Sequence, residues 1–576
     1  MTEKPRQNIL TVLLEDYFQV GAFDRLIREQ NWSRFEPRYV ENTLKALDLL
    51  DKNQTKATFF VLGWIAEQSP DLIREIVRRG HEIASRGYNH CPLARMSPAE
   101  FRADVRRTRE ILEKASGQEI VGHRTAEKLS FGRDLWTLDV LAEEGFRYDA
   151  SFMPTWSAIK NARFRRFAHE HRVGEKTIWE FPYSTRHLTK YLLPISGGNY
   201  FRQIPYTILR RAVENWHATT DAPFVLYFHV WELDTEQPRI NAASTYNRIR
   251  HYRKLDKMPW ILNENLSRYK FTSAADYLGI ISGAKALNPE EAETQKLEEE
   301  RKSEKIFSQI APASGRLRSS KNEKVTIVVP CYNEEKTLPY LSNTLKSLEN
   351  ALDYELSFIF VDDKSSDTTL EKLGELFGEN ENVRILQHAE NKGVAAGIMT
   401  GLKAAETEIV CSIDADCTYD PHELANMIPL LGEDVALVTA SPYHPAGGVR
   451  NVPAWRLSLS KGASWLYQKT LKAEELHTFT SCFRVYRRSV AAKIELKENG
   501  FLGVAEMFGK IYLQGGQIVE YPAVLEVRLF GFSKMKTART IVGHIQLLRR
   551  LRSMGGRDAK KTEADEKIVK ISEVNL

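Results

Sequence analysis

Three acidic side chains follow short apolar runs in the second half of the chain, and their type and spacing suit the binding of a cation and a diphosphate. Asp363 follows the run Phe358–Val361, and Asp414 and Asp416 stand in the stretch C-S-I-D-A-D-C. A third run, V-T-I-V-V, begins at Val325 and ends in the polar stretch P-C-Y-N-E-E. Buried parallel strands look like this when they deliver side chains to the carboxyl edge of a sheet, where open α/β sheets bind ligands. We therefore predict that these carboxylates share one sheet edge and hold a divalent cation together with a nucleoside diphosphate.

The elements that must position these carboxylates alternate between strands and helices. After the first strand, we predict that Asn333 and Glu334 cap an amphipathic helix whose apolar residues recur at helical spacing over Leu338–Leu348. The small residues of N-K-G-V-A-A-G, 391–397, allow a backbone to come close to a ligand or to another helix. Pro421 begins a further predicted helix after the D-A-D stretch.

Four later stretches continue this pattern: R-L-S-L-S-K-G-A (456–463), T-S-C-F-R-V-Y-R-R (480–488), G-F-L-G-V-A-E-M (500–507) and R-L-F-G-F-S-K-M (528–535). Together with the strand ends, they make the region from about residue 325 to 540 resemble the family 2 glycosyltransferases of the GT-A fold. The resemblance is strongest to the polyprenyl-phosphate sugar synthases, such as the dolichol-phosphate mannose synthases. It implies a Rossmann-like domain that transfers a sugar from a nucleotide-sugar donor.

The resemblance also implies roles for residues of this sequence. It implies nucleotide binding for Pro330, Tyr332, Asn333, Glu334, Asp363 and Asp414. Asp414 and Asp416 would hold Mg²⁺ or Mn²⁺, which neutralises the charge that develops on the leaving diphosphate, and Asp416 is predicted to be catalytic.

The acceptor in the resembling group is a lipid phosphate. Such an acceptor is already an anion, so it needs cations that position it rather than a general base. The predicted catalytic cations are Arg484, Arg528 and Lys534, and the predicted acceptor-binding residues are Arg456 and Ser460.

Two departures from the group's pattern leave the sugar and the acceptor open. Thr418 stands where the group usually has Gln after D-A-D. Thr478 stands where an Asp usually precedes the T-S-G-F-R run, and Cys482 replaces the Gly of that run. We expect polyprenyl phosphate as the acceptor, with a glycan as the alternative.

The first half of the chain also alternates strands with helices. Strands are predicted at Ile9–Leu14, Ala57–Leu62, His81–Ser85, Ile120–His123, Tyr148, Ile178–Pro182 and Phe224–His229. Helices are predicted at Val40–Leu50, Asp71–Arg79 and Pro98–Lys114, the last with Ser97 as its N-cap and Glu100 completing a capping box. The alternation favours a βα-repeat barrel or a doubly wound sheet.

Seven stretches of this half carry a second resemblance: E-D-Y-F-Q-V (15–20), A-T-F-F-V-L-G-W (57–64), G-H-E-I-A-S-R-G-Y-N-H (80–90), R-Y-D-A-S (147–151), W-E-F-P (179–182), P-I-S-G-G-N-Y-F-R (194–202) and Y-F-H-V-W-E-L-D (227–234). They make the region from about residue 9 to 280 resemble the polysaccharide deacetylases, in the branch found with exopolysaccharide synthesis genes. The resemblance implies a (β/α) barrel that removes N-acetyl groups with Zn²⁺ or another divalent cation held by one Asp and two His. It implies that Asp16 and His90 are metal ligands and that His229 is the catalytic acid.

Three positions depart from that pattern. Arg86 stands where the second metal-binding His would fall, and an arginine cannot ligate a cation. Leu13 stands where the branch carries an acidic residue, so that Glu15 would have to serve as the base, and the R-x-P segment ends in Ala126. We predict weak or absent deacetylase activity and a role as a scaffold or carbohydrate-binding module. An active enzyme with an unusual metal site is the alternative.

The predicted domain boundaries follow from these patterns. Residues 1–282 form the deacetylase-like domain, 283–322 a charged linker, 323–556 the glycosyltransferase domain and 557–576 a polar, disordered tail. In segment 534–552, an apolar stripe is flanked by three arginines. The stripe consists of Ile541, Ile545, Leu548 and Leu551. This basic amphipathic helix either lies on an anionic membrane surface or packs against its own domain.

The composition limits the class of protein. A net charge of +5 over 576 residues is too small for a dedicated nucleic-acid binder. The sequence has no run of about 18 apolar residues, and its start lacks the features of a signal peptide. Five cysteines without a C-x-x-C pair suit a reducing compartment. We expect a cytoplasmic protein, peripheral at the inner face of the membrane.

The sequence thus predicts a glycosyltransferase of envelope or exopolysaccharide synthesis, joined to a deacetylase-like domain. One alternative is a bifunctional enzyme that also N-deacetylates an amino sugar. A second alternative is a non-catalytic glycan-binding or assembly protein.

Overall fold

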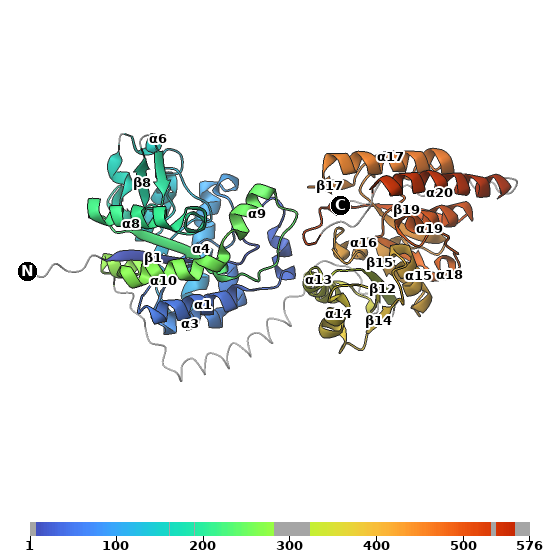
Figure 1. Ribbon diagram of the computed structural model, residues 1–576, viewed down its shortest axis with the longest axis horizontal. Helices are drawn as coiled ribbons and strands as arrows, with labels where there is room; N and C mark the ends of the chain where they lie inside the picture. Colours follow the sequence, from blue (N-terminus) through green and yellow to red (C-terminus); the bar gives the residue numbers. More distant parts are fainter. Residues whose placement is uncertain (1–6, 161, 189–190, 281–322, 532–536, 559–576) are drawn as a thin grey trace, which may run out of the picture. The chain divides into compact units, whose positions relative to one another are not determined.

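The computed structural model describes residues 7–160, 162–188, 191–280, 323–531 and 537–558 (Figure 1). The chain forms two compact units, one containing β1 to α11 and the other β12 to α20. The predicted boundaries near residues 282, 322 and 556 adjoin residues outside these ranges, so their positions stay predictions.

The N-terminal unit is built on a curled, open sheet with the strand order β10-β1-β2-β3-β4-β5-β7-β6, and β11 also pairs with β1. Its strands are β1 (Asn8–Leu14), β2 (Thr58–Val61), β3 (Glu82–Ser85), β4 (Gly122–His123), β5 (Tyr148–Asp149), β6 (His169–Val173), β7 (Lys176–Glu180), β10 (Val225–His229) and β11 (Phe271–Thr272). All pairs are parallel except β6 with β7. The seven predicted strands are present, and the incomplete barrel confirms the predicted fold class.

Helices follow the strands of this unit in the alternation that the sequence predicts. They are α1 (Tyr39–Lys52), α2 (Gly63–Gln68), α3 (Pro70–Arg78), α4 (Pro98–Ser116), α5 (Trp136–Glu143), α6 (Trp156–Ile159), α7 (Asn199–Gln203), α8 (Tyr206–Thr219), α9 (Thr245–Tyr252), α10 (Met258–Arg268) and α11 (Ala274–Leu278). The capping box of α4 is formed, because Ser97 Oγ accepts from the Glu100 amide and the Glu100 carboxylate accepts from the Ser97 amide. A hairpin of β8 (Thr185–Leu188) and β9 (Tyr191–Pro194) was not predicted.

The C-terminal unit contains a sheet with the order β14-β13-β12-β15-β18-β16-β19. Its strands are β12 (Lys324–Cys331), β13 (Glu355–Asp362), β14 (Val383–Gln387), β15 (Ile409–Ser412), β16 (Val435–Ser441), β18 (Arg484–Arg487) and β19 (Gln517–Pro522), with a separate ribbon of β17 (Gly448–Arg450) and β20 (Val524–Glu526). The three strands predicted to carry the carboxylates, β13, β12 and β15, are adjacent and parallel. Their carboxyl ends therefore meet at one edge, which confirms the predicted arrangement of the GT-A domain.

Both faces of this second sheet are covered. The helices are α13 (Leu338–Ala351), α14 (Thr369–Phe377), α15 (Val394–Ala404), α16 (Leu424–Met427), α17 (Ala454–Leu471), α18 (Arg488–Ala491), α19 (Phe501–Leu513) and α20 (Thr537–Asp558). Along β12, Ile327 joins a core with α13, whereas the next residue, Val328, joins a core with α15, α19 and α20. A strand buried on both faces in this way explains the continuous apolar run in the sequence.

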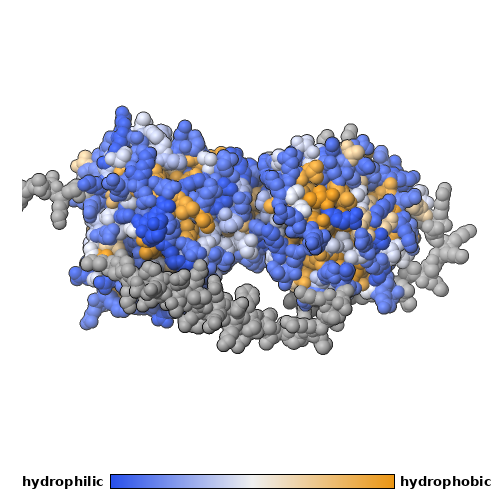
Figure 2. All heavy atoms as spheres, turned by 90° about the horizontal axis from the view of Figure 1, so that it is seen from below, coloured by the Kyte–Doolittle hydropathy of each residue, from blue (hydrophilic) through white to orange (hydrophobic). Residues whose placement is uncertain are grey.

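The surfaces of the two units are mostly hydrophilic on the face shown in Figure 2, with hydrophobic residues gathered toward the middle of each unit. Among the described residues, no helix has both the length and the apolar character needed to cross a bilayer.

Candidate active site

The carboxyl edge of β13, β12 and β15 is built from three tightly folded loops. Each loop contains a non-glycine residue in the left-handed region: Asn333 at φ 53°, Lys364 at φ 59° and Cys417 at φ 52°. This conformation is costly for residues with a Cβ, and it clusters at functional sites because the surrounding structure must hold it. The predicted cap at Asn333 and Glu334 is wrong, since α13 begins only at Leu338 with Thr337 at its N-cap.

Arg528 joins two of these loops. Its Nη2 donates to Glu334 Oε2, and its Nη1 lies 3.5 Å from Asp416 Oδ2. The hydroxyl of Thr337 donates to the same Glu334 oxygen at 2.9 Å, and Arg528 Nε is held by the Phe530 carbonyl at 2.8 Å. The structure thus places predicted nucleotide-binding and catalytic residues from distant parts of the sequence around one guanidinium.

Asp414, Asp416 and Glu334 place three carboxyl groups at this edge, and Arg528 is the cation described beside them. Burial, followed by the charge of Asp416, raises the pKa of Asp414 to about 7, although Arg528 acts in the opposite direction. Among the described residues, no group of three or more His, Cys, Asp and Glu side chains forms a metal site. Two carboxylates nevertheless fit Mg²⁺ or Mn²⁺, because Mg²⁺ is commonly held by one or two carboxylates together with substrate phosphates.

Asp363 binds the backbone of the loop that precedes α15, and its predicted nucleotide binding stays a prediction. Its Oδ1 accepts from the Lys392 amide at 2.8 Å and from His388 Nδ1 at 2.7 Å, and its Oδ2 accepts from the Gly393 amide at 2.6 Å. Both oxygens of this buried side chain are therefore engaged in fixing the loop before α15. Direct binding of a nucleotide by Asp363 is not supported by these contacts.

Small residues permit close backbone approach around this loop, as predicted. Gly393 has φ +104°, and a Cβ built there would lie 2.7 Å from Asn499 O and from Gly500 Cα. A Cβ at Gly397 would lie 3.0 Å from the Cβ of Pro330, so α15 packs directly on the end of β12.

The remaining predicted nucleotide-binding residues lie in the loop after β12. The Asn333 amide donates to Ser365 Oγ at 2.9 Å, and its side-chain Oδ1 accepts from the Ser366 amide at 2.7 Å. Tyr332 precedes Asn333 in this loop. The β12 and β13 loops are therefore tied together directly beside Glu334.

The predicted acceptor-positioning cations are not all at this edge. Arg484 on β18 is fully buried and donates to the carbonyls of Val504 and Phe479, both at 2.9 Å. These contacts support a structural role for Arg484, and its predicted catalytic role stays a prediction. Arg456 lies on α17, but its side chain, like the whole of Lys534, is outside the described residues. Ser460, also on α17, is half-buried.

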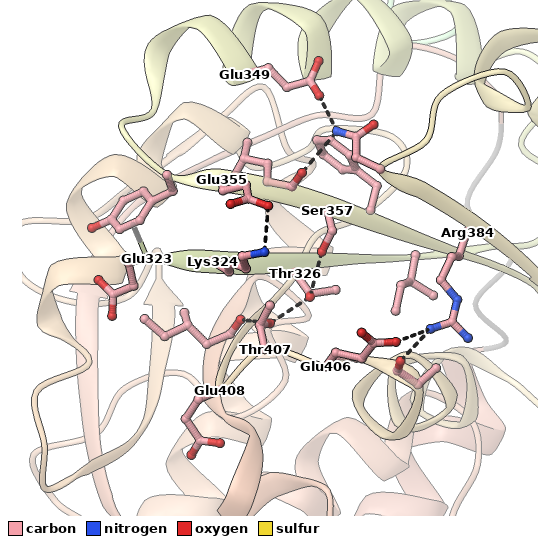
Figure 3. Close-up of a pocket in the computed structure, with 18 of the residues that line it drawn as sticks. Glu323, Lys324, Thr326, Glu349, Glu355, Ser357, Arg384, Glu406, Thr407 and Glu408 are labelled. Carbon is pink, nitrogen blue, oxygen red and sulfur yellow. Dashed lines mark hydrogen bonds and ion pairs between the residues drawn. The ribbon is translucent and has the colours of Figure 1, made fainter. Parts of the chain in front are cut away.

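The cavity shown in Figure 3 lies at the opposite, amino edge of the same sheet. It has a volume of about 1060 Å³, and its lining includes Lys324, paired with Glu355 at 3.0 Å, and Arg384, 3.6 Å from Glu406. It contains none of the strand-end carboxylates. Since open α/β sheets bind ligands at their carboxyl ends, we assign the active site to the loop edge rather than to this cavity.

The corresponding edge of the N-terminal unit contains a closed ion-pair network. Arg86 Nε and Nη2 donate to Glu15 Oε2 at 2.9 and 2.7 Å, and the other Glu15 oxygen contacts His229 Nδ1. Burial acts to raise the pKa of Glu15, but Arg86 and His229 together hold it well below its ordinary value. The guanidinium therefore neutralises the carboxylate that would otherwise act as a base.

The two predicted metal ligands of this unit, Asp16 and His90, make other contacts in the structure, and their metal binding stays a prediction. Asp16 accepts from the backbone amides of Tyr17, Arg38 and Tyr39 at 2.7–3.0 Å, so both of its oxygens are engaged. His90 lies 3.4 Å from Asp24 through Nδ1 and 4.0 Å from Glu15 through Nε2. These contacts do not by themselves support Asp16 and His90 as metal ligands, and the Arg86 guanidinium beside Glu15 would repel a cation there.

Two residues at the C-terminal site were not predicted from the sequence. His388 holds Asp363 and is itself bonded to Thr400 Oγ1 at 2.9 Å. Cys417 supplies the left-handed turn after D-A-D. The position of His388 just after β14 could have marked it as a site residue. Nothing in the sequence marked Cys417.

Comparisons with known proteins agree with this division of the chain. A family model described as glycosyl transferase family 2 matches residues 326–495, one described as polysaccharide deacetylase matches residues 30–178, and a domain of unknown function, DUF3473, matches residues 150–279. The dolichol-phosphate mannosyltransferase of Pyrococcus furiosus is 31% identical over 258 residues, which cover 44% of this chain and 68% of the relative. The polyprenol monophosphomannose synthase of Mycolicibacterium smegmatis is 28% identical over 37% of this chain and 81% of the relative.

A solved structure, the glucosyl-3-phosphoglycerate synthase of Mycobacterium tuberculosis in complex with Mn²⁺, uridine diphosphate and phosphoglyceric acid, is 18% identical over 41% of this chain and 79% of that chain. Its TM-score of 0.31 is too low for a comparison of individual residues.

Proposed function

Because the chain belongs to glycosyltransferase family 2 and carries a polysaccharide deacetylase domain ahead of that domain, we propose that it transfers a hexose from a nucleotide-sugar to polyprenyl phosphate. The observation that carries the proposal is the cluster of Glu334, Asp414 and Asp416 around Arg528 at the carboxyl edge of the sheet. The names of the relatives support a lipid phosphate as acceptor and mannose as the first sugar to test.

The site residues suggest how transfer would proceed. Asp414 and Asp416 would hold Mg²⁺ or Mn²⁺ with the donor, and the bound cation would stabilise the leaving diphosphate. Arg528, with one N–H on Glu334 and another near Asp416, is placed to bind an anion that enters between them. An acceptor phosphate oriented there can attack the anomeric carbon without a general base.

We also propose that this unit docks on a membrane surface. Figure 1 shows α17 and α20 side by side, and several large apolar side chains on them are exposed, including Trp465 at 57% and Val542 at 56%. Leu548 and Leu551 of the predicted stripe are buried in their own unit, whereas Ile545 is exposed. Part of α20 therefore packs inward, and the remaining apolar surface is shared with α17.

Co-sedimentation with vesicles of phosphatidylethanolamine and phosphatidylglycerol tests this docking. Trp465→Ser is expected to lower the bound fraction, while Trp260→Ser, which removes a similarly exposed tryptophan from the N-terminal unit, is expected to leave it unchanged. Equal binding by both variants would contradict docking through α17.

The proposed transfer is tested by a donor screen. The full-length protein is incubated with nucleotide-sugars, undecaprenyl phosphate and Mn²⁺, and released nucleoside diphosphate is measured. We expect release with one donor, its loss on chelation and its recovery when Mn²⁺ or Mg²⁺ is added back. No release from any donor, with binding to glycans that is insensitive to metal, would favour a non-catalytic glycan-binding protein.

For the N-terminal unit we propose a non-hydrolytic role. The support is the Arg86–Glu15–His229 network, in which the protein's own cation neutralises the carboxylate. Acetate release from N-acetylglucosamine oligomers in the presence of Zn²⁺ tests this role. Release that is abolished in His90→Ala would establish the bifunctional alternative instead.

A further inference from the structure

A cationic and aromatic cluster in the N-terminal unit lies beside the ion-pair network described above, with the Tyr227 ring 5.8 Å from the His229 ring. Arg124, just after β4, is only 2% exposed. Its Nη1 donates to Thr11 Oγ1 on β1 at 3.3 Å, while its Nη2 is buried without a hydrogen-bond partner. No ion pair of Arg124 is present in the described part of the chain. A buried guanidinium in this state is unusual, because an uncompensated buried charge costs several kcal/mol.

One acidic side chain, Glu180, acts electrostatically on Arg124 without pairing with it. Glu180 lies on β7 and interacts electrostatically with Arg124. It also shares a buried site with Asp149. Burial, together with the charge of Asp149, raises the pKa of Glu180 well above its ordinary value. This upward shift weakens Glu180 as a counter-ion for Arg124, and no ion pair joins the two side chains in the described part of the chain.

A second cation stands beside Arg124. Lys128 is half-buried, and its Nζ donates to Tyr200 Oη at 2.9 Å instead of contacting a carboxylate. Burial, assisted by the neighbouring charges of Arg250 and Arg124, lowers the pKa of Lys128 to about 7. Two cations thus lie together, and repulsion between them would be relieved by an anion.

Aromatic rings surround both cations. The Arg124 guanidinium carbon lies 4.7 Å from the ring centroid of Tyr183 and 4.6 Å from that of Tyr227. Lys128 Nζ lies 4.5 Å from the ring centroid of Tyr200. Lys128 and Tyr200 are partly exposed, so the cluster opens to solvent at this end. A planar guanidinium with free N–H groups matches a carboxylate, and aromatic faces suit the apolar face of a sugar ring.

We propose that Arg124 and Lys128 form a binding site for the carboxylate of an acidic saccharide, such as a uronate residue, whose ring packs against the neighbouring tyrosines. The site would retain the carbohydrate ligand class of a polysaccharide deacetylase domain while using no metal. It is independent of the glycosyltransfer proposed for the other unit.

Titration calorimetry on the full-length protein tests the ligand class. Trigalacturonate is expected to bind, maltotriose to bind at least about tenfold more weakly because it lacks carboxylates, and inorganic phosphate to bind weakly because it has no ring. Lys128→Met is expected to weaken trigalacturonate binding about tenfold or more, whereas Arg74→Met, which removes an exposed cation on α3, is expected to have no effect. Equal affinity for maltotriose, or phosphate binding as tight as trigalacturonate binding, would overturn the proposal.

An internal carboxylate provides a second test that does not remove the buried arginine. Thr11→Asp places a carboxylate where Arg124 already donates, and Thr11→Asn is its neutral match. We expect Thr11→Asp to fold and to lose trigalacturonate binding, and Thr11→Asn to retain most of it. Undiminished binding by Thr11→Asp would refute the site. Release of nucleoside diphosphate, measured in the same samples, should be unchanged, so failure of one proposal is separable from failure of the other.

Discussion

Two sheet edges in this protein both carry carboxylates, and they differ in how those carboxylates are neutralised. In the N-terminal unit, the Glu15 and Arg86 side chains are 1% and 2% exposed, and two N–H groups of Arg86 donate to one Glu15 oxygen. In the C-terminal unit, Arg528 is 19% exposed and lies 3.5 Å from Asp416, leaving Asp414 without a cation of its own.

The difference shows that carboxylates at a sheet edge do not by themselves make a metal-dependent site. A buried guanidinium that is bonded twice to its carboxylate satisfies that charge permanently. Excess negative charge at a solvent-accessible edge instead favours an external cation and an anionic ligand. We therefore place the transferase chemistry in the C-terminal unit and expect none of the hydrolytic chemistry in the N-terminal one.

The largest effect is expected from Asp416→Asn, which removes one of the two charges that would hold the cation. Turnover of the nucleotide-sugar should fall about 10²–10³-fold or more, as for other losses of transition-state charge stabilisation. Steady-state release of nucleoside diphosphate measures the change. Asp353→Asn, an exposed match outside the site, should retain full turnover. A similar loss in both variants would remove the distinction between Asp416 and an ordinary surface carboxylate.

The Arg86–Glu15–His229 network is expected to contribute to the free energy of unfolding. Arg86→Met leaves Glu15 buried without its cation, so the free energy of unfolding should fall by about 3–5 kcal/mol. Denaturant unfolding followed by tryptophan fluorescence measures the loss. Arg86→Met combined with Glu15→Gln should recover much of it, because no unpaired charge then remains. If the double variant is no more stable than the single one, Arg86 does not act through Glu15.

Substitutions of two arginines in the C-terminal unit are expected to have different effects, one on turnover and the other on stability. Arg528→Met is expected to lower turnover roughly 10–100-fold with little change in stability, because the side chain contacts the site carboxylates. Arg484→Met is expected to lower the free energy of unfolding by about 1–3 kcal/mol, since it leaves buried carbonyls without donors. Turnover and the free energy of unfolding are measured for both variants. A loss of turnover in Arg484→Met together with a loss of stability in Arg528→Met would reverse the assignment.

The smallest effect concerns pH and the N-terminal cluster. Lys128 carries its charge below a pKa of about 7, and it faces Arg124, Arg250, Tyr183 and Tyr200. Burial raises the pKa of Tyr200 to about 12, so this hydroxyl stays neutral near pH 7. Affinity for trigalacturonate should therefore fall several-fold as the pH rises through about 7. Calorimetry at several pH values measures this, and Lys128→Met should flatten the profile. A fall of the same size in Lys128→Met would assign the effect to another group.

Much of the fold could be predicted because parallel strands buried on both faces leave long apolar runs in the sequence. β12 and β13 were evident for that reason, and the polar residues after them marked the carboxyl edge. β18 was missed because its sequence, R-V-Y-R, alternates charged and apolar residues within a structural core. Arg484 of this strand donates to the Val504 carbonyl, 20 residues away in the sequence, and such a contact leaves no local sequence pattern.

Individual roles at the site were less predictable than its location. Asp363 and Asp414 both follow buried strands, but only the contacts of the folded chain show that Asp363 is used by the amides of Lys392 and Gly393. The replacement of a metal-binding His by Arg86 could be read from the sequence, whereas the two hydrogen bonds from Arg86 to Glu15 could not. The missing hydrogen-bond partner of Arg124 Nη2 likewise gave no signal, because it is a property of the fold.

The most direct test of the division between the two units is a single incubation in which two products are followed. The full-length protein is supplied with the active nucleotide-sugar, undecaprenyl phosphate, N-acetylglucosamine oligomers, Mn²⁺ and Zn²⁺, and nucleoside diphosphate and acetate are quantified together. We predict release of nucleoside diphosphate that is lost in Asp416→Asn, with no acetate from either protein. Acetate release that persists in Asp416→Asn, without any release of nucleoside diphosphate by the unmodified protein, would contradict the assignment.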